Sequence, residues 1–183
     1  DGLALPNVSQ TVARLLGVDL PGSLPLDAAV WGGDDPTGQI DRVVVFLSDG
    51  LGYLWLRQAI ADDADIAALV SDLTGGRGPL PLTSVAPSTT VTALSTLWTG
   101  RAPAAHGVLG LRLHLREIAM LVNMLGYKPA AGSHPDGILT HWGLPAEQFV
   151  PVPGLAEVLA AAGIPTHLLL PYSLMGTGLS RIL

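Results

Sequence analysis

The hydrophobic residues of this 183-residue chain fall into short runs, separated by segments rich in glycine, proline and aspartate. Residues 42–48 (RVVVFLS) form an apolar run without alternation, which is typical of a central parallel strand buried on both faces. Shorter apolar runs at residues 80–85 and 166–170 predict further strands of this kind. We therefore expect a buried, mostly parallel sheet.

Helical periodicity fills the intervals between these runs. We expect helices at residues 7–17, 53–63, 63–73, 90–100 and 154–163, several of which end at a glycine. Residues 109–116 alternate and predict an edge strand or ribbon, with His114 on its solvated face. Residues 117–127 are either a helix or a second strand that carries Asn123.

Together these elements predict an α/β fold in which helices flank a mostly parallel sheet. Residues 1–39 form a helix and an irregular lead-in, and residues 40–183 form the main domain. The chain ends soon after the predicted strand at 166–170, so we expect a sheet that is incomplete at the C-terminus.

Composition narrows the function classes. The chain is 49% hydrophobic and only 13% charged, with a net charge of -6 and one lysine, Lys128. It has no basic run, so we expect no nucleic-acid polymer as a partner. No apolar run approaches the ~18 residues of a membrane span, and we expect a cytoplasmic protein. Because cysteine is absent, any metal must be held by Asp, Glu, His or hydroxyl oxygens.

Two stretches carry candidate chemistry. Asp49 follows the strand at 42–48 directly, where open α/β sheets bind ligands, although an aspartate there is equally suited to capping the next helix. In the second stretch, the hydroxyl residues Ser88, Thr89 and Thr90 stand at the start of a predicted helix, whose first N–H groups can bind a phosphate or sulfate. The alternative role of these hydroxyl groups is to cap the helix. A right-handed crossover would place Asp49 and Thr90 on the same sheet edge.

Other polar residues are weaker candidates. His134, Asp136 and His141 lie close together in the sequence, but their spacing fits no rigid metal site, and scattered loop residues are the preferred interpretation. Asp34 and Asp35 are interpreted as solvated turn residues rather than a cation site.

The paired stretches VVVFLSDGLG and SVAPSTTVTALSTLWTGRAPAAHGVLG resemble the type I phosphodiesterase/nucleotide pyrophosphatase family of the alkaline phosphatase superfamily. The resemblance covers about residues 40–183, corresponding to the N-terminal half of such a catalytic domain. It implies an alkaline-phosphatase-like fold and metal-dependent hydrolysis of phosphodiesters or pyrophosphates in small phosphorylated substrates.

The resemblance also implies roles for individual residues. Two divalent metal ions, usually zinc, would be bound in part by Asp49 and Thr90, and Thr90 would be the nucleophile. Thr89 is the rival nucleophile, separated from Thr90 only by counting back from Thr99 and Gly100. His106 and the glycine after it match the His-Gly that follows the nucleophile helix in the family, and we interpret this histidine as structural.

The chain departs from the family pattern in two ways. Many members have Phe-Pro-Asn after the nucleophile, and that asparagine contacts the phosphoryl group. This chain has Val91, Thr92 and Ala93 at these positions. Thr92 or Asn123 would therefore have to replace the asparagine. Val91 would contribute a backbone N–H to substrate binding. The family's remaining metal ligands lie beyond residue 183, and we expect this chain alone to be inactive.

Two alternative functions remain open from the sequence. The first is a non-catalytic or partner-dependent module of the same fold, which self-associates or pairs with a missing C-terminal half through its exposed sheet edge. The second is a sulfatase or phosphonate hydrolase relative, which shares the fold and differs in substrate.

Overall fold

The structure is a computed structural model that describes residues 2–22, 24–32, 36–38, 40–171 and 175–182. Asp34 and Asp35 lie outside the described residues. The elements, in chain order, are α1 (Leu5–Leu15), η1 (Ala28–Trp31), α2 (Tyr53–Asp62), α3 (Ala64–Leu73), α4 (Thr90–Thr99), α5 (Pro103–His106), β1 (Arg112–Leu115), β2 (Met120–Asn123), β3 (Lys128–Pro129), α6 (Ile138–His141), η2 (Ala146–Gln148), α7 (Leu155–Ala161) and α8 (Gly178–Ile182).

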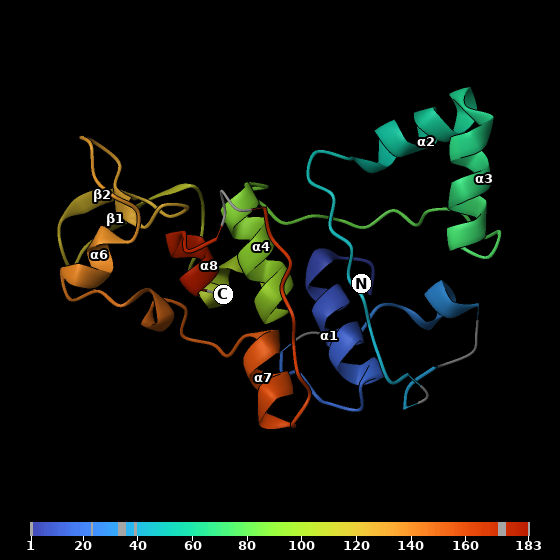
Figure 1. Cartoon of the computed structure of the whole chain (residues 1–183), viewed down its shortest axis with the longest axis horizontal. Helices are drawn as coiled ribbons and strands as arrows, with labels where there is room; N and C mark the ends of the chain where they lie inside the picture. Colours follow the sequence, from blue (N-terminus) through green and yellow to red (C-terminus); the bar gives the residue numbers. More distant parts are fainter. Residues whose placement is uncertain (1, 23, 33–35, 39, 172–174, 183) are drawn as a thin grey trace.

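Helices α1, α4 and α7 form the centre of the molecule, and the small sheet with α6 and α8 lies on one side of them (Figure 1). Helix α1 is the amphipathic helix expected near residues 7–17. Its buried residues include Val12 and Ala13, which join Leu20, Leu155 and Leu159 in one hydrophobic cluster. Helix α4 contacts both α1 and α7 and therefore links this cluster to the rest of the fold.

A second hydrophobic cluster joins α4 to the sheet. Val91 of α4 packs with Val108, Val122, Met124 and Tyr127, all of them almost completely buried. The sheet is antiparallel in the order β1-β2-β3, and Arg112 lies opposite Asn123 in its register. Residues 117–127 thus contain a strand, β2, which decides between the two alternatives that the sequence left open.

The expected parallel sheet is not formed by the described residues. Residues 42–48 and 166–170 belong to no strand, and Val44, Phe46 and Leu169 are 90%, 92% and 95% exposed. The expectation that these runs are buried strands is therefore wrong for this structure. An apolar run favours an extended backbone, but burial needs neighbouring strands, and no described segment pairs with either run.

Among the described residues, one contact of the predicted parallel kind is present. Thr83, in the expected strand at 80–85, forms an isolated parallel bridge with Ala4 just before α1. The Leu5 N–H donates to the Thr83 carbonyl at 2.9 Å, and the Thr83 N–H donates to the Leu3 carbonyl at 2.9 Å. This bridge fixes the chain that leads into α4 against the start of α1.

Helices α2 and α3 form a hairpin that stands away from the other helices (Figure 1). Neither helix has a buried residue, and Leu54, Trp55 and Leu73 are exposed. Asp63 ends α2 and caps α3, because its side chain accepts hydrogen bonds from the N–H groups of Asp65 and Ile66. The apolar residues of this hairpin therefore lie on its surface.

The cluster around Val91 should dominate the stability of the sheet. We expect Met124→Ala to lower the free energy of unfolding by about 2–5 kcal/mol, because it leaves a cavity in a packed site. The matched control is Met120→Ala on the same hairpin, where the side chain is 42% exposed and the loss should stay below about 1 kcal/mol. Urea unfolding measures both, and equal losses would contradict this description of the cluster.

Candidate functional site

The candidate site is built around the start of α4. Thr89 is the N-cap residue, and its Oγ1 accepts a hydrogen bond from the Thr92 backbone N–H at 3.4 Å. The hydroxyl oxygens of Thr89 and Thr92 are also 2.9 Å apart and share a hydrogen bond. Thr89 therefore performs the capping role that the sequence offered as the alternative for this segment.

Thr90 differs from its neighbour. It is the first residue of α4, and its side chain is exposed. The backbone N–H groups of Thr90 and Val91 lie in the first turn, where a helix offers them no acceptor. The Val91 side chain is buried, so this residue presents only its backbone to a ligand. One hydroxyl and two N–H groups at a helix start suit an anionic group.

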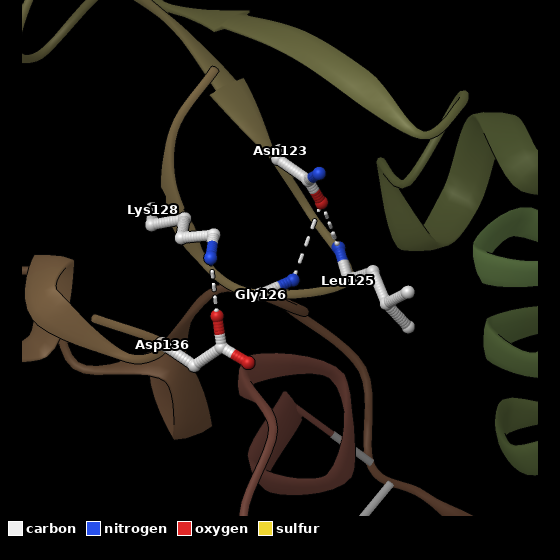
Figure 2. Close-up of polar contacts among 5 residues, drawn as sticks. All are labelled: Asn123, Leu125, Gly126, Lys128 and Asp136. Carbon is white, nitrogen blue, oxygen red and sulfur yellow. Dashed lines mark hydrogen bonds and ion pairs between the residues drawn. The ribbon is translucent and has the colours of Figure 1, made fainter. Parts of the chain in front are cut away.

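Thr92 and Asn123 are both engaged in contacts within the chain. The Thr92 side chain is fully buried, and its hydroxyl bonds to Thr89. The Asn123 Oδ1 accepts hydrogen bonds from the N–H groups of Leu125 at 3.0 Å and Gly126 at 3.2 Å, which closes the turn after β2 (Figure 2). To contact a substrate through these oxygens, either residue would have to give up a contact that holds the fold.

Asp49 lies in an exposed turn between residues 42–48 and α2. Its Oδ1 accepts a hydrogen bond from the Gly50 N–H at 2.9 Å, and Gly50 has a φ of 75°, which favours glycine. Among the described residues, no hydrogen bond or ion pair joins Asp49 to Thr90. The expected convergence of the two depended on the parallel sheet, and the structure does not show it.

His106 and His134 contact residues other than Thr90. His106 is fully buried, and both of its ring nitrogens are hydrogen bonded, which supports the interpretation that it is structural. His134 packs edge-on against Trp142, with ring centroids 6.0 Å apart. Asp136 forms an ion pair with Lys128 at 2.7 Å (Figure 2). His134, Asp136 and His141 form no metal-binding group in the described part of the chain.

The donor set does not fit a complete two-metal centre. Asp49 and Thr90 offer exposed hard oxygens, but two tetrahedral ions need about six protein ligands. The described residues include no cluster of three or more His, Cys, Asp or Glu side chains that could hold a metal ion. A cavity of about 100 Å³ lies elsewhere, where Thr99, Glu157 and Arg181 are among its lining residues.

A comparison with family models finds a match that includes the start of α4. Residues 43–118 match the model described as type I phosphodiesterase / nucleotide pyrophosphatase. The predicted resemblance to this family is confirmed over these residues. The matched segment contains Asp49, Thr90 and His106 but ends before Asn123. Comparisons with curated proteins and with solved structures found no match.

The match supports a phosphodiesterase-like hydrolase at the level of the family. In the part of the chain that the structure describes, no helix is both long and apolar enough to cross a membrane. The sequence did not predict the hydrogen bonds that link Thr89 to Thr92 and Thr96 to His106. The only signal for them was the spacing of hydroxyl residues along α4.

The two adjacent threonines should differ in their effect on stability. We expect Thr89→Ala to lower the free energy of unfolding by about 0.5–2 kcal/mol, because it removes the cap and leaves the buried Thr92 hydroxyl without this partner. Thr90→Ala should change it by less than about 0.5 kcal/mol, because the side chain is exposed. Thermal or urea unfolding compares them, and a larger loss in Thr90→Ala would contradict the assignment of Thr89 as the cap.

His106 should make stability depend on pH. Burial lowers the pKa of His106 from 6.5 to about 4. Between pH 4 and pH 6.5 the unfolded chain binds a proton that the folded chain does not. The free energy of unfolding is therefore highest above pH 6.5 and falls as the pH drops towards 4. The loss should reach roughly 3 kcal/mol. Urea unfolding between pH 7 and 4.5 measures it. The His106→Gln variant should lack this part of the pH dependence, and an unchanged slope in that variant would contradict the assignment.

Proposed function

We propose that this chain carries the nucleophile of a phosphodiester or pyrophosphate hydrolase and that Thr90 is this nucleophile. One observation supports Thr90 over Thr89: the Thr90 side chain is exposed at the first position of α4, whereas the Thr89 hydroxyl caps that helix. Both residues lie in the segment that matches the hydrolase family.

The proposed reaction has two steps. The Thr90 Oγ1 attacks phosphorus and its proton passes to solvent water, while the bond from phosphorus to the leaving oxygen breaks and that oxygen takes the bonding electrons. Water then attacks the phosphorylated threonine, restores the hydroxyl and releases the second product. The N–H groups of Thr90 and Val91 would donate to the phosphoryl oxygens, where negative charge concentrates.

The substrate-binding residues follow from the same placement. Val91 would act through its backbone, because its side chain is buried in the cluster with Val108. Thr92 would act indirectly, by bonding the Thr89 cap and fixing the first turn. Asn123 remains a proposed substrate contact only through its amide nitrogen, since its oxygen closes the turn after β2.

We further propose that Asp49 and Thr90 contribute to a centre of two divalent ions, with zinc as the metal that the family usually uses. Because the described residues supply too few donors for this centre, its other ligands would come from outside the described chain. The 183-residue chain alone would then be inactive.

A second candidate function is a partner-dependent module. The observation that favours it is the exposed apolar run at residues 42–48, where Val44 and Phe46 are 90% and 92% exposed. Extended backbone with unpaired N–H and C=O groups is a template for another strand, and a paired strand would bury these side chains. Such pairing would also fix Asp49, which follows the run directly.

The experiment is hydrolysis of an aryl phosphodiester with added zinc, by the 183-residue chain and by a chain extended with whatever its gene encodes beyond residue 183. We expect activity in the extended chain. Thr90→Val should lower it by on the order of a thousandfold or more, because the nucleophile is removed. Thr89→Asn is the matched control, since asparagine preserves the cap without supplying a hydroxyl.

Each other outcome has a definite meaning. Loss of activity in Thr89→Asn with retention in Thr90→Val would identify Thr89 as the nucleophile. Full activity of the 183-residue chain would contradict the proposed shortage of metal ligands. Preference for an aryl sulfate or a phosphonate would favour a sulfatase or phosphonate hydrolase. No hydrolysis by either chain, together with self-association that Phe46→Glu prevents, would favour the partner-dependent module.

A further inference from the structure

His106 forms two hydrogen bonds in a fully buried position. Its Nδ1 accepts from the Val108 backbone N–H at 3.1 Å, and its Nε2 lies 2.9 Å from the Thr96 Oγ1. A backbone N–H can only donate, so Nδ1 carries no proton and the neutral ring has its proton on Nε2. The Nε2–H group therefore donates to the Thr96 hydroxyl.

These two bonds connect separate parts of the fold. Thr96 lies in α4, whereas His106 is the last residue of α5 and Val108 follows it in the chain. Gly107 between them has a φ of 79°, which lets the chain turn back so that the ring reaches the Val108 N–H. His106 thus ties α4 to the turn that leads towards the sheet.

Two routes lead from His106 to Thr90. The first runs along α4, because a rigid helix transmits any rotation at Thr96 to its first turn. The second runs through the hydrophobic cluster, because Val108 packs in the same cluster as Val91, the neighbour of Thr90. Both routes fix how far α4 is rotated about its axis. In the present rotation Thr92 and Thr96 are buried and Thr90 is exposed.

We propose that His106 is a positioning residue that orients the Thr90 hydroxyl through its hydrogen bond to Thr96, while the Val108 N–H fixes the orientation of the ring. This inference rests on the proposed role of Thr90 as the nucleophile. His106 does not act on the substrate itself, since its ring is fully buried and both of its nitrogens are engaged within the chain. Its contribution is the geometry of attack, where a displacement of about 1 Å can cost about a hundredfold in rate.

Two variants of His106 separate its two bonds. His106→Gln places an amide N–H near the position of Nε2 and preserves the link to Thr96. His106→Asn places an amide oxygen near the position of Nδ1 and preserves only the bond from Val108. We expect His106→Asn to lower kcat about a hundredfold with little change in KM, and His106→Gln to recover most of this loss. The assay is the aryl phosphodiester hydrolysis described above, at a temperature where every variant is folded.

A second pair tests the same link from the helix. Thr96→Val removes the hydroxyl at nearly constant volume, whereas Thr96→Ser retains it. We expect Thr96→Val to have the same lowered kcat as His106→Asn, and Thr96→Ser to have the kcat of the unmodified chain. The double variant Thr96→Val/His106→Asn should show no further loss of kcat. If His106→Asn does not fold, this pair of Thr96 variants decides the result.

Nuclear magnetic resonance of the 183-residue chain gives a readout that does not need activity. We expect the amide signals of residues 89–93 to shift in His106→Asn and Thr96→Val, and to stay in place in His106→Gln and Thr96→Ser. If the unmodified enzyme hydrolyses nothing but these shifts occur, the proposed function fails and the orienting role of His106 stands. Unchanged signals, or equal kcat in the two His106 variants, would overturn the inference whatever the activity.

Discussion

The fold depends on the hydrogen bonds of three threonine hydroxyl groups that α4 buries. Thr92, Thr96 and Thr99 are almost fully buried, and a buried polar group without a partner is destabilising. Each finds a bond within the chain: Thr92 with Thr89, Thr96 with His106, and Thr99 with the Ser95 carbonyl. The bond from Thr96 to His106 joins α4 to another element and so favours one rotation of the helix about its axis, whereas the other two lie within α4 and its cap. The two hydrophobic clusters then pack around a helix whose orientation is already defined.

That orientation also separates two adjacent threonines of similar chemistry. Thr89 turns inward as a cap, and Thr90 is left exposed at the first turn. Asp49 is held far less firmly, because its only described hydrogen bond is to the next residue and the run before it is exposed. The two candidate residues therefore differ in how completely the chain positions them. The helix start is built by local contacts, whereas the Asp49 turn depends on strands that do not pair here.

Much of the local structure could be predicted from the sequence. The helices near residues 7–17, 53–63, 63–73, 90–100 and 154–163 are all present, because periodic apolar residues and terminal glycines act over a few residues. The edge strand or ribbon predicted at residues 109–116 is present as β1. The buried strands at 42–48 and 166–170 were not found, because strand burial requires partners distant in the sequence. The family was recognised from two motifs, and its match covers both.

The sequence by itself determined where the five longer helices α1, α2, α3, α4 and α7 lie, which family the motifs resemble, and that a hydroxyl would stand before α4. These properties depend on neighbouring residues, so a linear pattern contains them. Only the tertiary structure decided which threonine caps the helix, that Asn123 closes a turn, and that His106 bonds Thr96. The Thr89 cap and the Asn123 turn are contacts over two or three residues, for which the sequence offered more than one candidate role, whereas the bond between His106 and Thr96 joins two helices. Contacts between helices are set by packing and by the need to satisfy buried polar groups, which no local pattern specifies.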